Sequence, residues 1–69
     1  MRLRQTVARN LKRLRRVKGI SQEEFADKAD INRNYVGMIE RLENAASVDM
    51  LEKLAEALEV EAAEILREL

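Results

Sequence analysis

The chain has 69 residues, which suits one small domain over residues 1–69, and it contains neither cysteine nor histidine. These absences exclude disulfides, zinc fingers and most nucleophile–base pairs, so we expect no metal, no cofactor and no enzymatic activity. Its 13 basic and 13 acidic residues balance, and because no apolar run approaches the roughly 20 residues that span a bilayer, we expect a cytoplasmic protein without membrane contact.

The balanced net charge hides an uneven distribution of charge along the chain. Residues 1–20 carry eight basic side chains and no acidic one, whereas residues 21–69 carry five basic and all 13 acidic ones. A segment of +8 followed by one of −8 indicates one surface suited to a polyanion and another turned away from it. A basic helix that is only solvated, with no partner, would produce the same pattern.

The first predicted helix covers Arg2–Lys18. Proline is absent and good helix formers dominate the chain, apolar residues recur here at helical spacing, and Gly19 can end the helix. The expected buried face consists of Leu3, Val7, Leu11, Leu14 and Val17. The opposite face consists of Arg9, Lys12, Arg13 and Arg16. These basic residues either attract DNA phosphates or form an ordinary solvated surface.

Two short helices joined by a three-residue turn follow. The first, Gln22–Ala29, begins with a capping box between Ser21 and Glu24. The second, Arg33–Leu42, follows its N-cap Asn32. Such a pair forms a helix-turn-helix unit.

Two further helices complete the predicted fold. Ser47 is the expected N-cap of a helix over Val48–Leu58, and a last helix is predicted over Ala62–Glu68. No heptad pattern continues across the breaks, which argues against a coiled coil. The sequence therefore predicts an all-α, compact five-helix bundle that contains the helix-turn-helix unit.

The helix over Arg33–Leu42 has an apolar side and a polar side. The side expected to face the core consists of Tyr35, Val36, Ile39 and Leu42. The opposite side presents Arg33, Asn34, Gly37, Met38 and Arg41. Arginine can donate two hydrogen bonds to guanine, asparagine can pair with adenine, methionine can touch a thymine methyl group, and glycine lets a helix approach DNA closely. Each residue alone is also ordinary on a helix, so the prediction rests on their joint position.

The stretch Leu11–Leu66 resembles the Cro/CI family of helix-turn-helix regulators, also called the XRE family. Three segments carry the resemblance: Leu14–Ala26, Ile31–Arg41 and Leu51–Val60. It implies a lambda-repressor-like fold whose third helix reads the major groove, and hence a transcriptional regulator that binds double-stranded DNA.

The resemblance also implies roles for individual residues. The base-reading positions are Arg33, Asn34, Gly37 and Met38. The phosphate contacts are Gln22, Tyr35, Arg41 and Asn44. Arg15 and Glu40 match a partly buried ion pair that links the first helix to the third.

The chain departs from the family at several turns. Asp30 stands where the family has glycine between the second and third helices, and aspartate also tolerates tight turns. Leu42 and Glu43 stand where the family has glycine and then basic residues, and Glu43 would repel a phosphate. Glu59 replaces the family's glycine near the end of the fourth helix.

We expect a homodimer and no small-molecule ligand. One recognition helix reads too few base pairs, and two half-sites one helical turn apart restore specificity. The expected interface residues are Ile65, Leu66 and Leu69, unless these side chains cover the monomer's own core. An alternative is a protein-interaction module, such as an antitoxin-like partner, which would show no salt-dependent DNA binding. Within the regulator class, a phage-type repressor, a restriction–modification controller and a plasmid-borne regulator all remain open.

Overall fold

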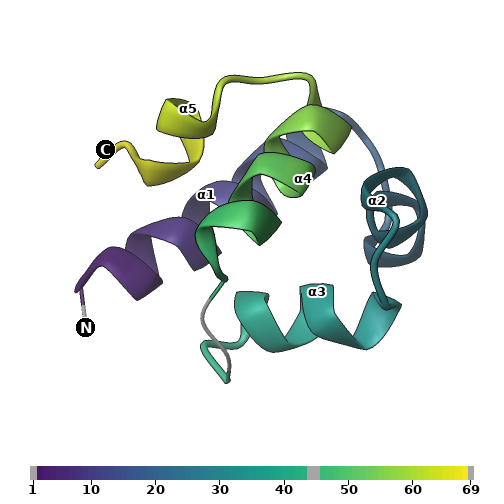
Figure 1. The fold of residues 1–69 in the computed structure, drawn as a ribbon, viewed down its shortest axis with the longest axis horizontal. Coiled ribbons are helices and arrows are strands. Elements are labelled where there is room, and N and C mark those ends of the chain that lie inside the picture. Colours follow the sequence, from purple (N-terminus) through teal and green to yellow (C-terminus); the bar gives the residue numbers. More distant parts are fainter. Residues whose placement is uncertain (1, 44–45, 69) are drawn as a thin grey trace.

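The computed structural model describes residues 2–43 and 46–68, and every regular element in these ranges is a helix (Figure 1). This confirms the predicted all-α, five-helix fold. None of the described helices is both long and apolar enough to cross a membrane. The helices are α1 (Arg2–Val17), α2 (Gln22–Ala29), α3 (Arg33–Glu40), α4 (Val48–Leu58) and α5 (Ala62–Leu66).

The packing of the helices leaves α3 at one edge of the molecule. α2 packs against both α3 and α4, α5 packs against both α1 and α4, and α1 also touches α3. Figure 1 shows α3 along the lower edge, with its upper side toward the other helices and its lower side open. The start of α1 and the end of α5 lie together on another side of the molecule.

Side-chain caps start three of the helices, as the sequence predicts. The Ser21 hydroxyl accepts from the Glu24 backbone N–H at 3.0 Å, and the Glu24 carboxylate accepts from the Ser21 N–H at 3.1 Å. Asn32 caps α3 and Ser47 caps α4, each accepting a backbone N–H two or three residues later. These bonds satisfy N–H groups that have no partner within a helix. The predicted bounds of α2 and α4 match the structure.

Left-handed residues follow four of the described helices: Gly19 after α1, and residues with side chains after α2, α3 and α4. Asp30, Leu42 and Glu59 have φ angles of +57°, +65° and +59°. This conformation costs a residue with a side chain about 1–2 kcal/mol relative to glycine. The helix predicted over Arg33–Leu42 therefore ends at Glu40, and Leu42 is 41% exposed instead of buried. The first and last helices also end earlier than predicted, at Val17 and Leu66.

The core lies between all five helices. Its largest fully buried apolar side chains are Leu11, Phe25, Val36, Ile39, Leu54, Leu58 and Ile65. Ile65 is 0% exposed, so its side chain packs in the core of the monomer. The prediction that it contacts a partner subunit is therefore wrong. Leu66 is 38% exposed, and Leu69 lies outside the described residues.

The predicted buried face of α1 is wrong at both ends. Leu3 is 50% exposed and Val17 is 74% exposed, whereas Val7 and Leu11 are buried. At about 100° per residue, Val17 is rotated by roughly 120° from Leu11. Val17 therefore points away from the core, although we predicted it beside the buried residues of this helix.

A buried asparagine links α1 to the end of α5. Asn10 is fully buried, and its side-chain amide donates to the backbone oxygens of Ile65 at 2.8 Å and Arg67 at 2.7 Å. The last carbonyls of a helix have no partner within that helix. Asn10 therefore supplies from α1 the donors that the end of α5 lacks, a role that the sequence did not reveal.

Candidate nucleic-acid interface

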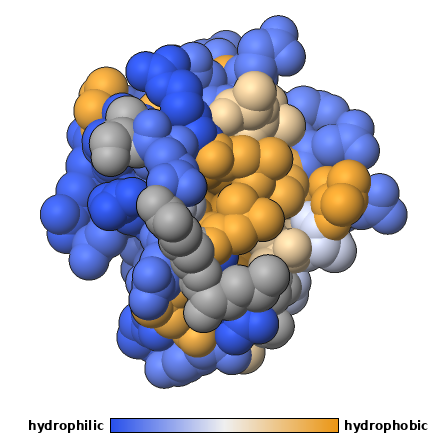
Figure 2. Space-filling view, turned by 90° about the vertical axis from the view of Figure 1, so that its left-hand side faces the viewer, coloured by the Kyte–Doolittle hydropathy of each residue, from blue (hydrophilic) through white to orange (hydrophobic). Residues whose placement is uncertain are grey.

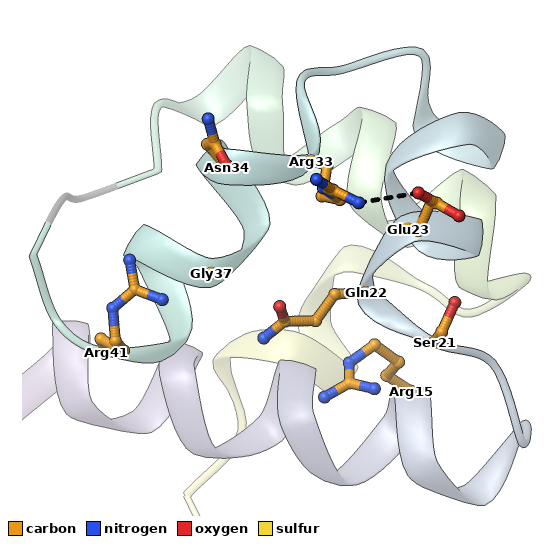
Figure 3. A pocket seen from close by; sticks show the side chains of 8 residues that line it. All are labelled: Arg15, Ser21, Gln22, Glu23, Arg33, Asn34, Gly37 and Arg41. Atoms are coloured by element: carbon orange, nitrogen blue, oxygen red, sulfur yellow. Dashed lines mark hydrogen bonds and ion pairs between the residues drawn. The ribbon is translucent and has the colours of Figure 1, made fainter.

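The exposed side of α3 and the start of α2 together form a shallow depression, which we call the α2–α3 depression (Figure 3). Val36 and Ile39 anchor the opposite side of α3 in the core. The depression is lined by Arg15, Ser21, Gln22, Glu23, Arg33, Asn34, Gly37 and Arg41. The structure thus gathers most of the predicted base and phosphate contacts on one open surface.

Arg33 and Asn34 occupy the first turn of α3, and both are exposed. The Arg33 Nη1 donates to the Glu23 carboxylate of α2 at 2.8 Å, and the two side chains are 64% and 65% exposed (Figure 3). A guanidinium has five N–H donors, so this bond leaves others for a base edge. Glu23 was not among the predicted site residues, since it is ten positions from Arg33 in the sequence.

Arg15 and Glu40 form the ion pair that the resemblance implied. Glu40 accepts from Arg15 Nε at 2.9 Å and from Arg15 Nη2 at 3.1 Å, with side-chain exposures of 3% for Glu40 and 12% for Arg15. Arg15 Nη1 also donates to the Ile20 carbonyl at 3.0 Å. The pair therefore joins α1, the turn before α2, and α3.

Gln22 also bonds to this ion pair. Its side-chain amide donates to Glu40 Oε1 at 3.1 Å, and it is only half-buried. The bond holds Gln22 at the wall of the α2–α3 depression (Figure 3). The predicted phosphate ligand is therefore oriented by the same carboxylate that orients Arg15.

Gly37 lies beneath the Arg41 side chain. A Cβ atom at this position would come within 2.8 Å of Arg41 Nη1 and 3.6 Å of Gln22 Oε1. A contact of 2.8 Å is too close for two heavy atoms that are not hydrogen-bonded. Glycine here therefore makes room for a guanidinium of the same chain, in addition to the predicted close approach to DNA.

Arg41 is paired with an acidic residue just beyond α3. Its Nε and Nη2 donate to the two Glu43 carboxylate oxygens at 3.0 and 3.1 Å. The hydrogen bonds and the charge of Arg41 hold the pKa of Glu43 below its ordinary value, and Glu43 raises the pKa of Arg41. The sequence indicated that Glu43 would repel a phosphate, but not that it binds Arg41.

Of the remaining predicted residues, the two that the structure describes, Met38 and Tyr35, do not line the α2–α3 depression. Met38 is half-buried on α3. Tyr35 is also half-buried and packs against the core, which agrees with its predicted apolar side. Asn44 lies outside the described residues.

Two short, crossed helices with the second exposed along a polar side define a helix-turn-helix DNA-binding regulator. The chain belongs to the helix-turn-helix family HTH_3, whose model matches residues 11–65.

Three known proteins illustrate this membership. The chain is 30% identical over 66 residues to the control protein C.SmaI of Serratia marcescens, covering 96% of this chain and 79% of that protein. It is 35% identical over 63 residues to the HTH-type transcriptional regulator SinR of Bacillus licheniformis, covering 90% of this chain and 57% of SinR. The solved structure of the restriction-modification controller protein C.AhdI from Aeromonas hydrophila superposes with a TM-score of 0.87 at 37% identity, covering 90% and 94% of the two chains.

Proposed function

We propose that the chain is a homodimeric transcriptional regulator that binds a palindromic operator, with α3 of each subunit in the major groove. The observation that carries the proposal is the open polar side of α3, which begins with Arg33 and Asn34 and is backed by buried apolar residues. Arginine and asparagine are the side chains that read guanine and adenine in the major groove. The protein acts by binding DNA and not by catalysis.

Phosphate contacts would orient α3 on the duplex. Gln22 is the first residue of α2, where backbone N–H groups and the helix dipole favour an anion. Arg41 at the end of α3 lines the same depression. Contacts on either side of the base-reading residues would fix the register of α3 without adding sequence information.

A second subunit would add a second half-site. Leu3 and Leu66 are 50% and 38% exposed, on two helices that pack together. Figure 2 shows apolar residues gathered in the middle of the side where α1 starts and α5 ends. Burial of such a surface against a second copy favours a two-fold dimer, and paired recognition helices read half-sites one helical turn apart.

Light scattering after size-exclusion chromatography tests the dimer. We expect a dimeric mass at high micromolar concentration and a shift toward the monomer in Leu66→Glu. Val17→Glu is the matched control, since Val17 is exposed at the opposite end of α1. A monomeric mass for the unmodified protein at that concentration would remove the dimer from the proposal.

Selection of bound sequences from a random duplex pool tests the DNA-binding proposal and yields an operator. With that operator, Arg33→Ala should weaken binding by about 1–3 kcal/mol and relax the preference at one base pair. Arg41→Ala should weaken binding to all sequences. Lys53→Ala is the charge-matched control on the exposed side of α4. If Arg33→Ala leaves affinity and preference unchanged, α3 does not read bases as proposed; if no duplex binds in a salt-dependent way, a protein-interaction module is favoured instead.

A further inference from the structure

The chain reverses direction at the end of α3 and brings the Glu43 side chain next to Arg41. The left-handed backbone at Leu42, with φ of +65°, reverses the chain direction. The Leu42 N–H then donates to the Ile39 carbonyl at 3.1 Å, and the Glu43 N–H donates to the Met38 carbonyl at 2.8 Å. Because the Glu43 backbone is anchored on the last turn of α3, its carboxylate is kept close to the arginine side chain that leaves the same turn.

The guanidinium of Arg41 is bound by Glu43 on one side and has open space over Gly37 on the other. Glu43 accepts from Nε and Nη2, while the missing side chain of Gly37 leaves space for Nη1. The guanidinium therefore lies over α3 with its Nη1 edge at the α2–α3 depression, on the side of Gln22 (Figure 3). An anion that enters the depression meets an arginine whose charge is already matched by a carboxylate.

This pairing changes the electrostatics of DNA binding. A DNA phosphate gains affinity from a basic side chain largely because salt counterions are released. Where a carboxylate of the protein itself neutralises the arginine, a phosphate must compete with that carboxylate, and fewer salt ions are released. The cost is the same for every DNA sequence, since phosphates carry no base information.

We propose that Glu43 is an internal competitor for DNA phosphate at Arg41, which lowers affinity for DNA of any sequence and weakens the salt dependence of binding. The inference rests on the proposed DNA-binding function and identifies a residue that sets how tightly the protein binds any DNA. Glu43 acts through Arg41 and is therefore a positioning residue, not a DNA ligand.

Salt-dependent binding to a random-sequence duplex, measured by fluorescence anisotropy, tests the proposal. Each phosphate contact adds about 0.9 to the slope of log K against log salt, so release of Arg41 in Glu43→Gln should steepen the slope by up to about 0.9. The affinity of this variant should then fall up to about 3.5-fold more than the wild-type affinity between 50 and 200 mM salt. The ratio of affinities for the selected operator and for random DNA should stay unchanged, because the cost is the same for every sequence.

Three further variants make this test specific. Glu56→Gln makes the same change of charge in a separate depression between α4 and α5, and it should leave the slope unchanged. Glu43→Asp retains the carboxylate and should keep a slope near that of the wild type. In an Arg41→Ala background, Glu43→Gln should not change the slope further, because the arginine for which Glu43 and phosphate compete is absent.

The outcomes separate the two proposals. If Glu43→Gln and Glu56→Gln give the same slope, or if the effect of Glu43→Gln persists without Arg41, Glu43 is not a competitor at Arg41 even though the protein binds DNA. If the wild-type protein itself shows no salt-dependent binding, the DNA-binding proposal fails, and the inference fails with it.

Discussion

The ion pair between Arg15 and Glu40 should be the most costly polar contact to break. The change is Glu40→Ala, which removes the carboxylate partner of an Arg15 side chain that is 12% exposed in the unmodified protein. Only the bond to the Ile20 carbonyl, at 3.0 Å, would remain of the Arg15 contacts described above. In this variant the positive charge of Arg15 lies between α1, the turn before α2, and α3, with no carboxylate bonded to it.

The expected loss follows from the burial of the pair. Breaking a buried ion pair by removing one partner costs about 3–5 kcal/mol. We expect a value near the lower end, about 3 kcal/mol, because the Arg15 side chain still reaches some water. At about 0.05–0.15 kcal/mol per residue, the whole chain has about 3–10 kcal/mol of stability, so this loss is a large share of it.

Urea unfolding followed by circular dichroism measures this loss. The double variant Arg15→Met with Glu40→Leu removes both charges and keeps apolar volume, and it should unfold within about 1 kcal/mol of the wild type. A cost below about 1 kcal/mol for Glu40→Ala would refute the argument from burial. So would a double variant that loses as much as the single variants Arg15→Met and Glu40→Leu together, because the charges would then not be coupled.

Three other changes test separate features. Asn10→Ala should lower the free energy of unfolding by about 2 kcal/mol in urea, since it removes two donors at 2.8 and 2.7 Å from buried or partly buried carbonyls, and a negligible loss would contradict that role. Glu59→Gly should raise the thermal midpoint, because relief of about 1–2 kcal/mol of left-handed strain exceeds the added entropy of the unfolded chain; a lower midpoint would show that the strain is absent. Arg41→Ala should raise the pKa of Glu43 toward its ordinary value in an NMR titration. In the unmodified protein this pair contributes stability above the unfolded-state pKa of Glu43, and the contribution disappears as pH falls through the lowered folded-state pKa. An unchanged titration midpoint would mean that Arg41 does not cause the shift.

The helix starts could be predicted because their chemistry is local. Ser21, Asn32 and Ser47 each cap a backbone N–H within three residues, so the residue type and the following sequence suffice. The helix ends were harder to predict. Leu42 and Glu59 adopt a conformation that glycine favours, and nothing in their residue types indicates it.

The exposure of the polar side of α3 and the Arg15–Glu40 pair could be predicted, but the other contacts of the candidate site could not. Arg33 and Asn34 are exposed on α3, as the apolar periodicity of that helix indicates. The bond from Arg33 to Glu23 depends on how α2 crosses α3, which a one-dimensional pattern does not contain. The pair of Arg41 with Glu43 depends on the left-handed turn at Leu42, which the family's glycine at this position indicates but the leucine itself does not.

The bonds from Asn10 to the end of α5 also bear on how the protein is made. They join residues 55 and 57 positions apart in the sequence. During synthesis, the Asn10 side-chain amide can therefore exchange its bonds to water for these two carbonyls only after residue 67 has been made. We expect the nascent helices to reach their final arrangement together and late, so that a shortened product lacking α5 would be an open target for proteases.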